Sequence, residues 1–125
     1  MANQPLKGLP RLWAAFLNSI QGFKDAWKGE EAFRMEFWVL LVSVPLALWL
    51  SATMFQAALL IGAIVMVLIV EVLNSAIEAV VDRIGPERHE LSRIAKDLGS
   101  LAVMLSMILA GVIWAAALWD RFVAA

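Results

Sequence analysis

The stretch that decides the fold is AALLIGAIVMVLIVEVLNSAIE, residues 57–78. Residues 57–70 carry no charge, which is typical of a helix that spans a membrane. Two carboxylates, Glu71 and Glu78, then follow within the same apolar stretch. An ionised side chain near the centre of a bilayer costs about 2.5–3.5 kcal/mol on insertion scales, and such residues usually serve a function. We therefore interpret both glutamates as candidate site residues.

The spacing of the polar residues in this stretch places them on one helical face. Glu71, Asn74 and Glu78 stand at i, i+3 and i+7, and Asp82 extends the face by one more turn. Three carboxylates and an amide on one face favour a site for a cation or a phosphate. The alternative is a set of hydrogen bonds and ion pairs between helices that holds a bundle together.

The composition indicates an integral membrane protein forming a single domain, residues 1–125. Of its 125 residues 62% are hydrophobic, well above the 45–50% or so of soluble domains. The net charge of −1 argues against nucleic acid as a partner. The absence of cysteine excludes disulfides and thiolate metal sites, and a single histidine, His89, excludes a histidine-cluster metal site.

Apolar runs predict an all-α membrane protein with three transmembrane helices, at about 33–53, 55–82 and 87–122. An apolar face at helical spacing predicts a further, amphipathic helix at about 9–28 that lies on the membrane surface. Basic residues gather before the first span and between the second and third spans, while residues 51–54 carry none. The positive-inside rule therefore places the N-terminus and the second loop in the cytoplasm and the C-terminus outside.

Depth in the membrane predicts different roles for the carboxylates. If the second span enters the bilayer near Phe55, hydrocarbon ends near Leu73, so Glu71 lies just inside the apolar edge. A carboxylate at that edge suits a general base. Glu78 lies in the wetter zone and suits a hard cation such as Mg²⁺, and Glu30, near the same interface, is a candidate second ligand.

The loop after the second span carries charged residues that suit polyphosphate or a nucleotide, namely Arg88, His89, Arg93, Lys96 and Asp97. A solvated cluster that only sets the topology is the alternative. The chain lacks the phosphate-binding loop, the dinucleotide fingerprint and the catalytic loop of soluble kinases. Residue chemistry alone therefore indicates a membrane-interface enzyme or a transporter that uses carboxylates and a divalent cation.

Specific motifs narrow this choice. The run EVLNSAIEAVVDR, residues 71–83, is followed by His89-Glu90-Leu91-Ser92 and by AKDLGS, residues 95–100, and is preceded by Glu30-x-Ala32-Phe33-Arg34-x-Glu36. Together they resemble the bacterial diacylglycerol kinase family of the Gram-negative type, in order and spacing, over nearly the whole chain. The resemblance implies a homotrimer in the bacterial inner membrane that phosphorylates diacylglycerol to phosphatidic acid with MgATP, at a site assembled between neighbouring subunits.

The resemblance also implies roles for individual residues. Glu71 matches the general base that also meets the lipid hydroxyl, Glu30 and Glu78 match the Mg²⁺ ligands, and Asn74 helps to organise the site. Asn18 stands where the family has an aromatic residue beside the nucleotide, so this position departs from the pattern. Further nucleotide contacts would be Glu87, Arg88, His89, Lys96 and Asp97, and lipid-side contacts would be Arg11, Lys24 and Ser100.

Three other functions remain open at this point. An undecaprenol kinase on the same fold would differ only in its acceptor lipid. A small proton-coupled multidrug exporter also uses a membrane glutamate in a short chain, but would need four spans and no metal site. A scaffold or regulatory subunit would have no catalytic role.

Overall fold

The computed structural model describes residues 4–124, and all regular secondary structure among them is α-helical. Helix α1 covers Leu9–Gly29, α2 covers Glu31–Leu50, α3 covers Met54–Ile84 and α4 covers Glu90–Phe122. The helices α2, α3 and α4 are long and apolar enough to cross a membrane, which confirms the predicted number of spans. At 1.5 Å per residue, α3 and α4 exceed the ~30 Å of hydrocarbon, so each extends beyond it.

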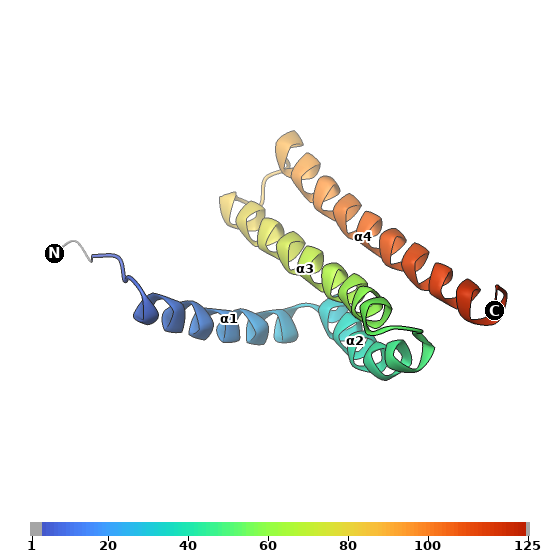
Figure 1. Ribbon diagram of the computed structural model, residues 1–125. Helices are drawn as coiled ribbons and strands as arrows, with labels where there is room; N and C mark the ends of the chain where they lie inside the picture. Colours follow the sequence, from blue (N-terminus) through green and yellow to red (C-terminus); the bar gives the residue numbers. More distant parts are fainter. Residues whose placement is uncertain (1–3, 125) are drawn as a thin grey trace.

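Helix α3 is the central element of the bundle. It packs against both α2 and α4, whereas α2 and α4 touch only slightly. Figure 1 shows these three helices side by side, with α1 projecting away from them toward the N-terminus. None of the residues of α1 is buried. The packing that defines the bundle therefore lies along the two faces of α3.

Small residues line the contacts of α3 with its neighbours. One buried cluster joins Ala47, Leu50, Leu60 and Ala117, and a second joins Ala63, Val67 and Ala110. Helices in lipid gain little from hydrophobic burial, so close van der Waals packing at small residues supplies much of their association. Long apolar side chains instead cover the outward surface of the chain.

Polar side chains define where α3 and α4 begin. Thr53 Oγ1 accepts a hydrogen bond from the Gln56 backbone N–H at 3.1 Å, and Gln56 Oε1 accepts one from the Ala52 N–H at 2.7 Å. This reciprocal pair resembles a capping box and starts α3. His89 Nδ1 accepts from the Leu91 N–H and caps α4. Helix α4 therefore begins at Glu90 rather than at the predicted residue 87, because residues 87–89 form the loop that leads into this cap.

Candidate active site

The junction of α1 and α2 consists of one residue, Glu30. Its backbone is extended (φ −123°, ψ 105°), and it ends α1 and caps α2 at the same time. Its N–H donates to the Ala26 carbonyl, and its own carbonyl accepts from the Arg34 N–H. Its carboxylate makes no hydrogen bond to the start of α2. The side chain of Glu30 is therefore available for another partner.

Glu71 is the only acidic residue buried among the described positions, with a relative exposure of 7%. It lies on α3, and its charge interacts repulsively with those of Glu30 and Glu78. The charges of three carboxylates, from the α1–α2 junction and from α3, thus interact within one chain. Like charges close to one another repel, so this grouping favours the binding of a cation or a proton.

Asn74 lies between these carboxylates and α4. Its Nδ2 donates to Glu78 Oε1 at 3.5 Å, while its Oδ1 is buried without a hydrogen-bond partner. A methyl group added at Gly99 on α4 would collide with the Asn74 side chain. The buried Gly99 therefore lets α4 approach the amide closely. Such an orphaned buried acceptor calls for an explanation, and a bound ligand or water would supply one.

Glu36 belongs to the same group of carboxylates, although the sequence pattern indicated it only as part of a motif. Both carboxylate oxygens are buried without a hydrogen-bond partner, and its charge interacts with that of Glu71. The signal was present in the sequence, because Glu36 is the one acidic residue on the apolar side of Arg34 in the first span. Its nearness to Glu71 depends on how α2 packs on α3, which helical spacing within α2 does not reveal.

A second polar region lies at the loop between α3 and α4. A hollow of about 630 Å³ is lined by residues 81–82, 85–90, 92, 93 and 96, so four of the predicted nucleotide contacts line it: Glu87, Arg88, His89 and Lys96. Lys96 Nζ bonds Asp82 Oδ1 at 2.8 Å and ties the two helix ends together. Asp97 does not line the hollow and instead bonds Arg93 at 2.7 Å.

The predicted contacts on α1 lie apart from the loop. Arg11 and Asn18 share a shallow hollow of about 480 Å³ on one side of α1, and Lys24 borders another nearer to α2. Figure 1 shows α1 projecting from the start of α2, and α1 makes no substantial contact with α3 or α4. Ser100 is exposed on α4, one residue beyond Gly99. A single chain therefore gathers the carboxylates but separates the contacts on α1 from those in the loop.

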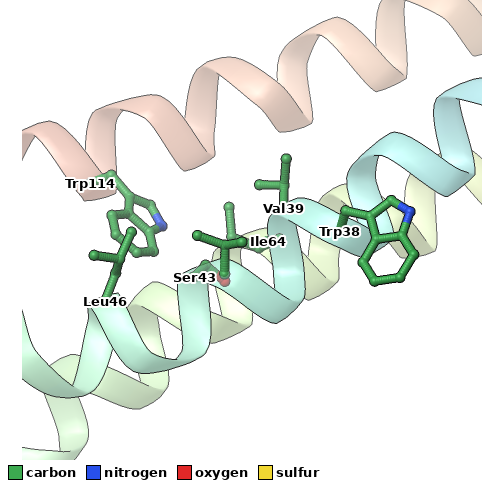
Figure 2. A pocket seen from close by; sticks show the side chains of 7 residues that line it. Trp38, Val39, Ser43, Leu46, Ile64 and Trp114 are labelled. Carbon is green, nitrogen blue, oxygen red and sulfur yellow. The ribbon is translucent and has the colours of Figure 1, made fainter.

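A groove in the apolar part of the bundle runs between α2 and α4, with α3 as its floor. Its volume is about 370 Å³, and Figure 2 shows it extending from Trp38 past Ser43 to Leu46 and Trp114. The hydroxyl of Ser43 donates to the Leu40 carbonyl, and Trp114 Nε1 donates to the Leu60 carbonyl. Both polar groups are thus satisfied by the protein, so the groove suits an apolar occupant.

The donor set fits a hard cation only in part. Among residues 4–124, no three acidic, histidine or cysteine side chains come together in a group able to hold a metal ion. Two carboxylates, Glu30 and Glu78, are of the kind that Mg²⁺ accepts, and Mg²⁺ ordinarily takes its remaining ligands from water and substrate phosphates. The residues present therefore fit a metal that arrives with a nucleotide.

These features define a helical membrane protein with a buried acidic site at one end of its spans and a charged loop beside it. The model of the family described as prokaryotic diacylglycerol kinase matches residues 17–118. The chain belongs to this family and is an enzyme, a lipid kinase.

Named relatives agree with this assignment over nearly their whole length. The diacylglycerol kinase of Escherichia coli K12 is 48% identical over 122 residues, covering 98% of this chain and 99% of the relative. The diacylglycerol kinase of Pseudomonas aeruginosa PAO1 is 43% identical over 118 residues, covering 92% and 96%. That of Haemophilus influenzae is 44% identical over 107 residues, covering 86% and 91%.

Proposed function

We propose that this enzyme transfers the γ-phosphoryl group of MgATP to the primary hydroxyl of diacylglycerol and releases phosphatidic acid and ADP. The observation that carries the proposal is the burial of Glu71 at the polar end of an apolar helix, beside the charges of Glu30 and Glu78. A lipid hydroxyl reaches this depth from the bilayer, and ATP reaches it from water. The reaction therefore takes place at the cytoplasmic membrane interface.

Glu71 acts as the general base. Its carboxylate takes the proton from the lipid hydroxyl as the hydroxyl oxygen forms its bond to the γ-phosphorus and the bond to ADP breaks. A positioned base contributes about 10²–10⁴-fold to such a step. Burial in the helix bundle keeps bulk water from this carboxylate and so limits hydrolysis of ATP. Asn74 holds Glu78 by its amide and leaves its buried Oδ1 free for a ligand.

Glu30 and Glu78 would hold the Mg²⁺ that accompanies ATP, and this metal would neutralise charge on the phosphates. Changing either residue to Gln should raise the Mg²⁺ concentration needed for half-maximal activity, because one anionic ligand is lost. Arg121→Gln, at the opposite end of α4, should leave the Mg²⁺ dependence unchanged. A Mg²⁺ titration at saturating ATP checks this. Unchanged dependence in both glutamate variants would make these residues structural.

The loop hollow receives the nucleotide. Arg88 and His89 are exposed within it, and Lys96 becomes available when the triphosphate competes with Asp82 for its ammonium group. Asp97 and Glu87 complete the proposed nucleotide contacts. Asn18 contributes from α1, where its amide replaces the aromatic ring that the resemblance predicts.

The groove between α2 and α4 holds an acyl chain of the acceptor. Its lining offers no free polar group, while Glu36 and Glu71 lie toward the cytoplasmic end, where the lipid hydroxyl must stop. Arg11, Lys24 and Ser100 contact the lipid at head-group level. In this arrangement the apolar groove aligns the chain, and the carboxylates receive the hydroxyl.

The working enzyme is a homotrimer in the bacterial inner membrane, with its N-terminus in the cytoplasm and its C-terminus in the periplasm. The exposed apolar surface of α1, and the fact that Asn18 and the loop residues line separate hollows, support a site that is completed by α1 of a neighbour. The carboxylates, by contrast, interact within one chain. Mixed trimers of Glu71→Gln and Glu30→Gln subunits should therefore recover no activity. If the two residues came from different subunits, about one site in four would be intact.

An acceptor assay tests the function itself. The purified enzyme in detergent micelles should transfer phosphate from ATP to diacylglycerol much faster than to undecaprenol. A preference for undecaprenol would be consistent with the proposed roles of the carboxylates but would contradict diacylglycerol as the acceptor lipid. Absence of transfer to either lipid would overturn the proposal.

A further inference from the structure

Arg34 connects the two helices that meet at Glu30. Its guanidinium Nη1 donates to the Trp27 carbonyl at 2.6 Å and to the Lys28 carbonyl at 3.3 Å. Both carbonyls belong to the last turn of α1, while Arg34 lies in the first turn of α2. The side chain thus reaches back across the junction and caps the helix that precedes its own.

This cap satisfies groups that have no partner within α1. The last four carbonyls of a helix lack intrahelical donors, and the negative end of the helix dipole lies there. The Ala26 carbonyl receives the Glu30 N–H, and Arg34 serves the next two carbonyls. At a membrane interface such carbonyls are costly to leave unpaired, and a cation suits this position. Arg34 therefore links the end of α1 to the start of α2 by charge-assisted bonds.

The other contacts at the junction do not fix the angle between α1 and α2, so this angle depends on the hydrogen bonds of Arg34. Aromatic rings pack across it edge to face, with Phe23 against Phe33 and Phe37, and Trp27 against Phe37 and Trp38. These contacts stabilise the approach of α1 to α2, but rings of this kind tolerate several tilts. Beyond them, α1 has little contact with the bundle. Two hydrogen bonds from one planar guanidinium restrict the angle far more closely.

We infer that Arg34 is a positioning residue, which caps the end of α1 and so fixes the direction in which Glu30 presents its carboxylate toward Glu71 and Glu78. The inference rests on the proposed role of Glu30 as a Mg²⁺ ligand. Glu30 is the single residue between the two helices, so any change in the angle between them rotates its backbone and moves its carboxylate. Arg34 need not touch the nucleotide or the metal to affect them.

The first test is a Mg²⁺ titration of Arg34→Met, which keeps much of the apolar length and removes every donor. The Mg²⁺ concentration for half-maximal activity should rise by about 10–100-fold, the usual effect of losing a residue that orients a metal ligand. The KM for diacylglycerol should stay within about twofold of the parent value. Arg34→Lys retains the charge and one bond, so its Mg²⁺ requirement should fall between those of the parent and Arg34→Met. Arg121→Met serves as the matched arginine control and should behave as the parent.

The second test measures geometry without activity. The chain has no cysteine, so Ala15→Cys on α1 and Leu48→Cys on α2 can carry spin labels, with labelled subunits diluted in unlabelled ones. The distance distribution between the labels should broaden in Arg34→Met, should broaden less in Arg34→Lys, and should stay narrow in Arg121→Met. If Arg34→Met does not fold, the Mg²⁺ titration and the distance measurement are made on Arg34→Lys alone.

Three results would overturn the inference. A raised Mg²⁺ requirement with an unchanged distance distribution would mean that Arg34 acts directly on the phosphates. A broadened distribution with an unchanged Mg²⁺ requirement would mean that the cap is merely structural. An increased KM for diacylglycerol alone would make it a lipid contact. Failure of the proposed function is recognised separately, because Glu30→Gln would then leave the Mg²⁺ dependence unchanged, whatever the labels report.

Discussion

The two ends of α3 differ in the chemistry of the side chains that surround them. Near the start of α3, Leu60 is fully buried in a cluster of apolar side chains, and its carbonyl receives the indole N–H of Trp114. Toward the end that joins the α3–α4 loop, the charges of other carboxylates act on Glu71, and Asn74 on α3 and Glu36 on α2 have buried oxygens without hydrogen-bond partners. Helix α3 thus packs among apolar side chains at one end and among carboxylates and an amide at the other, although the buried Ser51 Oγ just before its start also lacks a hydrogen-bond partner. We therefore expect the first end to contribute mainly to stability and the second to contain the reactive groups.

The largest expected effect concerns Glu71. Glu71→Gln should lower kcat by about 10²–10⁴-fold, because the amide cannot accept the proton of the lipid hydroxyl. Its thermal unfolding should be no less cooperative than that of the parent, since removing a buried charge does not open a cavity. Turnover assays and unfolding in detergent check both points. Turnover within a few-fold of the parent would move the role of base to another carboxylate, and Glu36 would be the first candidate.

Leu60→Ala, near the start of α3, should lower stability and leave activity nearly unchanged, which is the opposite of the effect expected for Glu71→Gln. The lost contacts should cost about 2 kcal/mol or more, the lower part of the range for such truncations, because lipid takes up apolar surface as well as the protein interior does. The activity per folded molecule should stay within a few-fold of the parent. Chemical unfolding in micelles measures the first quantity, with the neighbouring half-exposed Leu59→Ala as the control. Equal losses in both variants would show that the cluster is not the packing core.

Gly99→Ala tests the close contact between α4 and the Asn74 side chain on α3. The new methyl group would collide with the Asn74 side chain, whose far end must swing away. Because that adjustment is confined to a flexible side chain, unfolding should change little, while kcat should fall by about tenfold as the amide leaves its place beside Glu78. Ser100→Ala, one residue further along α4, is unsuitable as a control because Ser100 is a proposed lipid contact. Gly111→Ala on the same helix is the matched control, because an added methyl group there meets no atom within 4 Å. An unchanged kcat would remove Asn74 from the site.

The smallest expected effect concerns the ion pair between Asp82 and Lys96. Both side chains are exposed, and exposed ion pairs often contribute no measurable stability. Asp82→Asn should therefore leave the unfolding midpoint unchanged. Since it also frees Lys96 for phosphate, the KM for ATP should fall slightly and become more sensitive to salt. A clear loss of stability would mean that this pair, rather than the packing around Leu60, holds α3 to α4.

Much of the fold followed from local patterns. Hydropathy predicted three spans because a helix needs about 20 apolar residues to cross the hydrocarbon core. Within that core the backbone groups must be hydrogen-bonded inside the segment, as they are in a helix. Local signals were weaker at the ends of helices, where α4 starts three residues later than predicted because His89 caps it. The acidic face of α3 was also readable, since residues at i, i+3 and i+7 share one side of any helix.

Only the tertiary structure decided which groups meet. The sequence by itself determined a membrane protein with Glu71, Asn74 and Glu78 on one face, because these properties depend on composition and on the helical repeat. It did not reveal that the charge of Glu36 acts on Glu71, that Gly99 leaves room for the Asn74 side chain, or that Arg34 caps the end of α1. These contacts join different helices, and no repeat within one helix specifies the rotation of another. Packing of small residues along α3 sets those rotations, and with them the geometry of the acidic site.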